Sequence, residues 1–327
     1  MTFARSVVLA ASIAIGFAQH RAQSQTTATH RRASTFRVLQ WNVSGEAWTT
    51  HADLARRILR HADPDILVLD EVSPSLGAVG VRRMLSGLRS PADTSWYVSF
   101  GEGGAYQRTV IASRDSVRAV PEFALVPFPD TGLASAAAAI PDSVVSHPTP
   151  AEGRTVGTNA ALVRVVRQSV LVVGMDLTSS GAAGSWRDWR RRVEATAIRE
   201  RLRSALLRWH PDAVVVAGDM NIVTGPAPLD TLIAGLAHSA IGPLRAADAV
   251  HFDRWTTWTW DGRGTGFNGG RLDIVAYSAG TLRLLNARVW NTELMPADTL
   301  RAHDLTPASS ASINRHRPVV VDLAYFR

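Results

Sequence analysis

The sequence predicts a single α/β domain with mixed β-sheets, and three observations support this class. Short runs rich in valine, isoleucine and leucine recur along the 327 residues, and several are apolar on both faces, as in strands of a covered sheet. Patterns with helical spacing lie between these runs. Two neighbouring runs, 159–166 and 169–177, are too close for a crossover connection, which predicts an antiparallel hairpin and argues against a purely parallel sheet.

The expected strands follow these apolar runs in order: 36–43, 65–72, 109–114, 159–166, 169–177, 213–221, 272–278 and 318–326. A first helix is expected at 53–62, with leucine and isoleucine on one face and Pro64 after its end. A longer helix is expected at 185–210, with an apolar stripe made of Trp186, Trp189, Val193, Ala197, Leu202 and Leu206. The segment 121–153 is rich in Pro, Ala and Ser and is interpreted as edge strands and loops, because the strand and helix alternation resumes after it.

The N-terminus has the pattern of an export signal. Arg5 precedes a short apolar stretch, and small residues at Ala22 and Ser24 suit a signal peptidase. We therefore expect a signal peptide at 1–24, a disordered lead-in at 25–35, and one domain at 36–327 that is exported to the periplasm or the extracellular space. An uncleaved membrane anchor is the alternative. No later run approaches the length of a membrane span, so the mature chain is expected to be soluble.

Composition excludes several kinds of chemistry. The chain has no cysteine, which excludes disulfides, thiolate nucleophiles and cysteine-ligated metals. It also has no lysine, which excludes Schiff-base chemistry and a P-loop lysine. The net charge of +7 favours anionic partners such as phosphates, nucleic acid or lipid headgroups.

Polar residues stand at the ends of several predicted strands. They are Asn42, Glu71, Asp219, Asn221, Asp273 and His316. Each has an ordinary structural explanation: Asp219 is compatible with a turn after Gly218, for example, and His316 with a hydrogen-bonded histidine beside a proline. Together they favour one crevice that holds a hard divalent cation and a phosphate, because oxygen ligands suit magnesium and histidine can accept a proton or stabilise charge.

The motifs QWN, DEV, GDMN, RLDIV and RHRPV, in this order, resemble the endonuclease/exonuclease/phosphatase superfamily, which includes pancreatic-type deoxyribonuclease. The resemblance covers about residues 36–327. It implies an α/β four-layer sandwich of two mixed β-sheets flanked by helices. It also implies cleavage of a phosphoester that depends on Mg²⁺ (or Mn²⁺).

The resemblance also implies roles for the matching residues. Glu71 would be the principal metal ligand, with Asn42 beside it. Asp219 and Asn221 would share a strand face, where they bind and orient the attacking water and the scissile phosphate. His316, held by Asp273, would act as the general base or as an imidazolium that stabilises the phosphate.

Two positions depart from the family's pattern. Asp176 stands where the family usually has histidine, and Arg315 precedes His316 where the family usually has aspartate. Asn221, Arg315 and Asp176 are the residues expected near the substrate phosphate. A carboxylate beside a phosphate is repulsive, so Asp176 must be neutralised, turned away or bound to a cation. Our hypothesis is that Arg315 compensates Asp176, either by pairing with it or by holding the phosphate.

These features predict an exported phosphoesterase that depends on a divalent metal and cleaves phosphodiesters. The chain is expected to be a monomer. Its substrate is open among nucleic acid, a phospholipid headgroup and a small phosphoester. In the stretch TWTW, Trp258 and Trp260 have alternating spacing and are expected to pack on one strand face; the alternative is a base-stacking or lipid-facing rim formed with Trp255. The competing function is a catalytically reduced binding or scaffold domain on the same fold.

Overall fold

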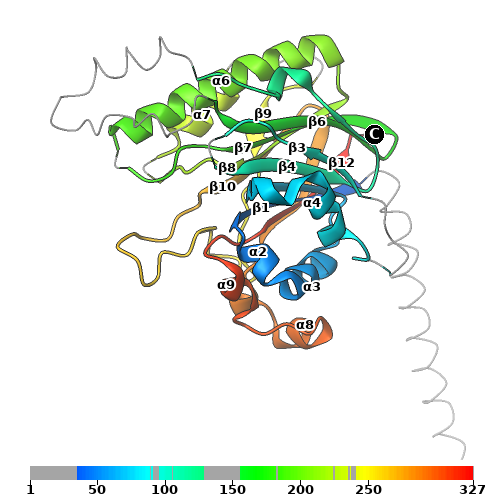
Figure 1. The fold of residues 1–327 in the computed structure, drawn as a ribbon, viewed down its shortest axis with the longest axis vertical. Coiled ribbons are helices and arrows are strands. Elements are labelled where there is room, and N and C mark those ends of the chain that lie inside the picture. Colours follow the sequence, from blue (N-terminus) through cyan, green and yellow to red (C-terminus); the bar gives the residue numbers. More distant parts are fainter. Residues whose placement is uncertain are drawn as a thin grey trace, which may run out of the picture.

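The computed structural model describes residues 35–88, 90, 96–104, 106–128, 155–181, 183–223, 225–234, 236 and 241–326. The predicted signal peptide, the lead-in up to residue 34, and residues 129–153 of the predicted loop segment lie outside these residues. Two six-stranded sheets make up the centre of the described chain (Figure 1). Both sheets are mixed, because β1 is parallel to β2 and β7 is parallel to β8, whereas the other pairs are antiparallel.

The first sheet has the order β11 (Leu282–Val289), β12 (Val319–Tyr325), β1 (Thr35–Gly45), β2 (Ile66–Val72), β4 (Arg108–Ser113) and β3 (Tyr97–Phe100). The second sheet has the order β5 (Val117–Ala119), β6 (Gly157–Val165), β7 (Gln168–Asp176), β8 (Ala213–Asp219), β10 (Asp273–Ser278) and β9 (Leu244–Ala246). All eight predicted strands are present, and β6 and β7 form the predicted antiparallel hairpin.

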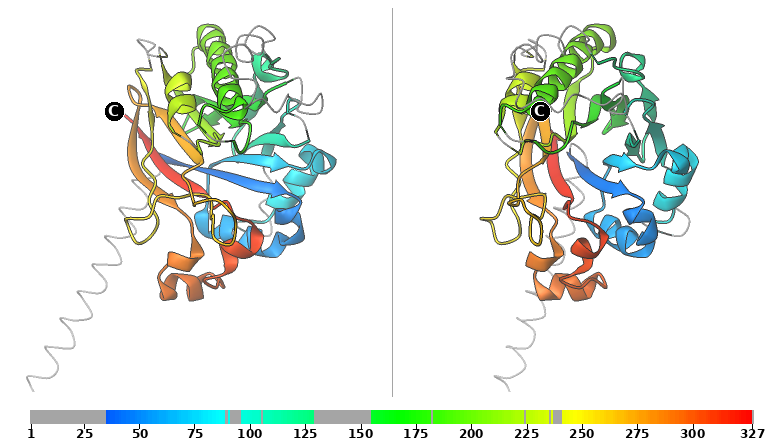
Figure 2. Two further views of the ribbon diagram at one scale, coloured as in Figure 1. Left: turned by 90° about the vertical axis from the view of Figure 1, so that its left-hand side faces the viewer. Right: turned by 60° about the vertical axis from the view of Figure 1, so that its left-hand side comes forward.

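Helices cover the outer faces of the two sheets. Figures 1 and 2 show α6 (Trp186–Trp209) and α7 (Ala227–Ile233) over the second sheet, with α2 (Ala47–Thr50), α3 (Ala52–Ala62) and α4 (Gly77–Leu85) over the first. The short helices α8 (Ala297–Ala302) and α9 (Ser309–Ile313) also pack on the side of the first sheet. Three short 3₁₀ turns are found at Pro74–Leu76, Pro121–Phe123 and Thr292–Leu294. The predicted sandwich of two mixed sheets flanked by helices is confirmed.

Alternation along the central strands builds three apolar layers. In β7, Val172 packs between the two sheets, whereas its neighbours Leu171 and Val173 pack beneath α6. In β1, Val38 faces the second sheet and Leu39 faces α3 and α4. Successive side chains of a strand point to opposite faces, so a strand with apolar neighbours on both sides is apolar throughout.

The two predicted helices agree with the structure. Ser185 caps α6 by accepting a hydrogen bond from the backbone N–H of Asp188, and the helix ends at His210, which has a left-handed backbone. The predicted stripe of α6 packs on the second sheet: Leu202 is fully buried, and Trp189 is partly buried against the same cluster. Within the described residues, none of the helices combines the length and the apolar character needed to span a bilayer.

Candidate active site

The layer between the sheets becomes polar at one end. In β1, Val38 belongs to the apolar core and is followed at alternate positions by Gln40 and Asn42, both fully buried. In β8, Ala217 is followed in the same way by Asp219. Because alternate residues share a face, these polar side chains continue the rows that form the inter-sheet core. Polar groups from both sheets therefore meet at this end.

Strand register places three carboxylates in one row. Asp219 of β8 is paired with Asp176 of β7 and with Asp273 of β10. Directly opposed residues are nearest neighbours across a sheet, so their side chains interact. Asp219 and Asp273 are each 1% exposed, and Asp176 is partly buried. Buried like charges are costly, so this row requires protons or positive charge beside it.

Glu71 reaches the same place through a distortion of β2. In a regular strand, Asp70 would point to the inter-sheet face and Glu71 would point away from it. The pairing of β2 shifts register here, and Glu71 has a left-handed backbone with φ 56. Asn42 Nδ2 then donates to Glu71 Oε1 at 2.9 Å and to Asp219 Oδ2 at 3.0 Å. Such a conformation costs about 1–3 kcal/mol in a residue with a side chain, which is typical of functional positions.

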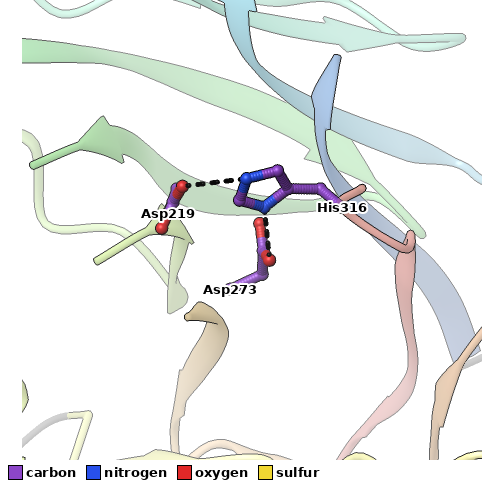
Figure 3. A group of neighbouring side chains, drawn as sticks. All are labelled: Asp219, Asp273 and His316. Carbon is purple, nitrogen blue, oxygen red and sulfur yellow. Dashed lines mark hydrogen bonds and ion pairs between the residues drawn. The ribbon is translucent and has the colours of Figure 1, made fainter. Parts of the chain in front are cut away.

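His316 lies between two of the carboxylates (Figure 3). Its Nδ1 is 2.9 Å from Asp273 Oδ2, and its Nε2 is 3.7 Å from Asp219 Oδ2. Burial lowers the pKa of His316, but the charges of Asp273 and Asp219 raise it by more, so that the pKa is about 9. Burial, together with the charge of Asp273, raises the pKa of Asp219 to about 7, although His316 opposes this shift. The predicted contact between His316 and Asp273 is present.

The amide of Asn42 faces the carboxylates with its nitrogen. Its Oδ1 accepts a hydrogen bond from the backbone N–H of Ser44 at 3.0 Å, while its Nδ2 donates to Glu71 and Asp219. A metal ligand must offer a lone pair, and an amide nitrogen offers none. In this orientation Asn42 holds the two carboxylates in place and differs from the metal ligand that we expected. Gln107 supports Glu71 from the other side, because its Nε2 donates to Oε2 at 3.1 Å.

A buried network beneath the site includes residues to which sequence reasoning gave no role. Gln40 Nε2 donates to Asp70 Oδ2 at 2.9 Å and to Asp273 Oδ1 at 3.0 Å. The backbone N–H of Asp219 also donates to Asp70 Oδ2, at 3.1 Å. Burial raises the pKa of Asp70 well above its usual range, although the hydrogen bond from Gln40 lowers it. The sequence offered one sign of this network: Gln40 and Asp70 each interrupt an apolar run whose neighbouring residues are buried in the structure.

Asn221 does not share a strand face with Asp219, contrary to the prediction. β8 ends at Asp219, and Asn221 has a left-handed backbone with φ 48. Its backbone N–H folds back to donate to Asp219 Oδ1 at 2.9 Å, and its Nδ2 donates to the carbonyl of Leu177 at 2.8 Å. Asn221 therefore lies at the site because the chain turns there. Gly218 permits this close packing, because a Cβ at this position would lie 1.9 Å from the carbonyl oxygen of Met175.

The carboxylates offer oxygens that suit a hard divalent cation. Glu71, Asp176 and Asp219 each place one oxygen within 4.8 Å of the other two. Asp219, Asp273 and His316 form a second group with the same spacing. The second group includes the imidazole of His316, whose Nδ1 pairs with Asp273, whereas the first group offers carboxylate oxygens alone. The first group therefore fits a cation better, because magnesium and related ions bind carboxylate oxygens.

Arg315 does not pair with Asp176, so the pairing half of our hypothesis is wrong, whereas a contact of Arg315 with the phosphate stays a prediction. The Arg315 side chain is exposed, and its Nη1 donates to the carbonyls of Asp261 and Arg263 at 3.1 and 2.6 Å. Burial raises the pKa of Asp176 well above its usual range, and Glu71 and Asp219 raise it further. No ion pair to Asp176 is found within the described ranges.

The tryptophans of the segment 255–260 differ in exposure, and Trp258 and Trp260 are both partly buried. Trp255 is 86% exposed, whereas Trp258 is partly buried. The Trp258 ring contacts His251, with 4.5 Å between ring centroids, and the Arg317 guanidinium lies 5.5 Å from its centre. The exposed side chain of Trp255 is compatible with the predicted rim, but Trp258 serves mainly as packing.

Comparisons with known proteins agree with this architecture. No curated protein matches the chain in sequence. Among solved structures, truncated Caenorhabditis elegans TDP2 has a TM-score of 0.55 at 14% identity, covering 90% of this chain and 98% of that one. The human Nocturnin catalytic domain with a bound sulfate has a TM-score of 0.53 at 14% identity, covering 89% and 95%. ANGEL2, described as a 2′,3′-cyclic phosphatase, has a TM-score of 0.55 at 14% identity, also covering 89% and 95%.

At these identities the solved structures establish the fold alone. The family model described as "Endonuclease/Exonuclease/phosphatase family" matches residues 39–296, most of the chain. This range contains every carboxylate of the site, and only His316 follows it. The chain belongs to the endonuclease/exonuclease/phosphatase family.

Proposed function

We propose that this chain is an exported phosphodiesterase that requires a divalent cation such as Mg²⁺ or Mn²⁺. The observation that carries the proposal is the convergence of Glu71, Asp219 and the His316–Asp273 pair from separate strands of two sheets. Support also comes from the fold neighbours, since ANGEL2 is described as a cyclic phosphatase and Nocturnin contains a sulfate. A cluster of buried carboxylates that had no catalytic role would lower the stability of the fold and bring no functional benefit.

A bound divalent cation would neutralise the phosphate and stabilise the charge that develops on its oxygens. The side chains of this chain divide the remaining work. Asp219, which lies beside Glu71 and His316, would orient the attacking water and can accept its proton through an oxygen not bound to the cation. His316, with its pKa near 9, would then be an imidazolium that stabilises a phosphate oxygen, and Asp273 would hold that ring in place.

Hydrolysis of bis-p-nitrophenyl phosphate tests this proposal directly. We expect turnover with Mg²⁺ or Mn²⁺ and none with EDTA. Glu71→Gln and His316→Ala should each reduce kcat by about 100-fold or more. Asp298→Asn is the matched control, because its carboxylate is exposed and paired with Arg301 on α8. Turnover that survives EDTA or both substitutions would exclude the proposed mechanism.

A substrate panel would separate the remaining classes of phosphoester. DNA, RNA, sphingomyelin and inositol phosphates should be compared at the same concentration of metal. The net charge of +7 favours anionic polymers slightly over small phosphodiesters, which carry fewer negative charges. Binding of these ligands with no hydrolysis of any of them would instead support a binding or scaffold domain.

Export is part of the proposal and rests on the N-terminal sequence. Residues 1–24 lie outside the described part of the chain, so the evidence is their charged start, apolar stretch and small residues. Sequencing the N-terminus of the mature protein from the periplasm or medium would test it. An intact Met1 on cytoplasmic protein would refute export and leave the hydrolase proposal untouched.

A further inference from the structure

Asp176 is the carboxylate of the site that the structure leaves without a compensating group. It ends β7 directly opposite Asp219 of β8, with one oxygen within 4.8 Å of oxygens of both Asp219 and Glu71. Arg315, the cation next to His316 in sequence, donates its hydrogen bonds to backbone carbonyls instead. Asp176 is therefore neither paired with Arg315 nor turned away from the other carboxylates, and its position suits binding to a cation.

In this orientation, Asn42 does not present its side-chain oxygen to a cation beside Glu71 and Asp219. Both of its side-chain ends have defined partners: the oxygen accepts from Ser44, and the nitrogen donates to Glu71 and Asp219. Exchanging the two ends would break these hydrogen bonds and would place an oxygen against two carboxylates. The oxygens that lie close together in this cluster are those of Glu71, Asp176 and Asp219.

We propose that Asp176 is a ligand of the divalent cation, together with Glu71 and Asp219. This inference rests on the proposed function, because it assigns a ligand to the cation which that function requires. The spacing agrees with a shared ion: Mg²⁺–oxygen bonds are about 2.1 Å and Ca²⁺–oxygen bonds about 2.4 Å, so two ligands of one ion are at most about 4–5 Å apart. Each of the three carboxylates has an oxygen within 4.8 Å of the other two, which is compatible with one shared ion.

Strand geometry favours this role for Asp176. Asp176 and Asp219 end two parallel neighbouring strands in register, so the sheet itself fixes the spacing of their side chains. Glu71 faces them from the other sheet, where Gln107 and Asn42 hold its two oxygens. A ligand pair on rigid strands is preorganised, and binding a cation there requires little movement.

A third carboxylate should change how the site binds metal. The divalent charge is more than balanced by three carboxylates, so affinity for a hard cation rises while the phosphate loses part of its attraction. The wild-type chain is therefore expected to bind Mn²⁺ more tightly than a variant with an uncharged residue at Asp176. Without metal, repulsion among the carboxylates is unrelieved, so the same variant should melt at a higher temperature than the wild type.

The test measures Mn²⁺ binding to the mature chain by electron paramagnetic resonance of free Mn²⁺ and by calorimetry, with no substrate present. Asp176→Asn keeps the shape and removes the charge, and Asp176→Ser is a second variant in case the first misfolds. We expect the Kd for Mn²⁺ to rise at least about 10-fold in both. Asp298→Asn makes the same chemical change on exposed α8 and should leave the Kd unchanged.

The outcomes separate this inference from the proposed function. Weaker Mn²⁺ binding in both Asp176 variants, with a smaller rise in melting temperature on adding metal, supports Asp176 as a ligand. Wild-type affinity in both variants overturns the inference, while metal-dependent hydrolysis by the wild-type chain would still stand. If the wild-type chain binds no Mn²⁺, both the inference and the proposed function are overturned.

Discussion

The stacked histidine pair on the helical side of the first sheet predicts a loss of stability in acid. His61, at the end of α3, lies against His303 with 3.5 Å between ring centroids and against Trp290 with 4.6 Å. His61 is partly buried, and its Nε2 has no hydrogen-bond partner among the described residues. Burial, together with the charges of His303 and Arg37, lowers the pKa of His61 from 6.5 to about 4.

The sign and size of the effect follow from this shift. Between about pH 6.5 and pH 4, the unfolded chain binds a proton at His61 that the folded chain does not, so stability falls as the pH falls. One pKa unit corresponds to about 1.4 kcal/mol, which makes the full contribution about 3 kcal/mol and about 2.5 kcal/mol by pH 4.5. Asp219 has the opposite sign, because its folded pKa is raised to about 7 and its protonation relieves repulsion as the pH falls.

Because the two effects oppose each other, the assay compares variants. Urea unfolding of the wild type and His61→Phe should be measured at about pH 7.5 and pH 4.5, and phenylalanine keeps the aromatic contacts without the titrating ring. The wild type should lose about 2.5 kcal/mol more than the variant over this range. His210→Asn is the control, since His210 is an exposed C-cap with φ 44, which asparagine tolerates. Equal losses in the wild type and His61→Phe would refute the argument.

Three substitutions elsewhere have definite expected outcomes. Gly218→Ala should destabilise the fold by at least about 3 kcal/mol, measured by urea unfolding, because its Cβ would lie 1.9 Å from a backbone carbonyl oxygen and the φ is 151; a soluble variant with wild-type stability would contradict the strand packing. Gln40→Met should lower kcat about 10-fold to 100-fold with little change in KM, since the amide that donates to Asp273 is lost, and an unchanged kcat would deny Gln40 a positioning role. Arg317→Met should cost about 3 kcal/mol in thermal unfolding, because Arg317 is 1% exposed and donates to Asp261 at 3.1 Å; a cost below about 1 kcal/mol would indicate that the pair is energetically neutral.

The strands that sequence analysis missed share one structural property. β3, β5, β9 and β11 are the edge strands of the two sheets. Each has fewer buried neighbours than a central strand, and β11 alternates between buried and exposed residues from Leu282 onward. Central strands are apolar on both faces and are therefore visible as runs, whereas edge strands are short or polar. The apolar pattern thus predicted the middle of each sheet and not its borders.

The site was predictable where its residues obey the alternation of a regular strand. Asn42, Asp219 and Asp273 continue inter-sheet rows, so a polar residue at the end of an apolar run marked each of them. Glu71 and Asn221 reach the site through left-handed backbone conformations, which no apolar pattern reveals. For these two, the position came from the family resemblance and the geometry from the structure.

The failed pairing of Arg315 with Asp176 follows from the same alternation. Neighbouring residues of an extended segment point to opposite sides, so if His316 faces the inter-sheet layer, then Arg315 faces away from it. His316 is buried between two carboxylates, and Arg315 is exposed against the segment at 261–263. Because Arg315 directly precedes the inward-facing His316, it is expected to face outward. It is therefore poorly placed to pair with an inward-facing carboxylate. Arg317, the neighbour of His316 on its other side, has the same parity as Arg315; it is buried, but its guanidinium donates to Asp261. Neither arginine pairs with Asp176, which agrees with our proposal that Asp176 binds the cation.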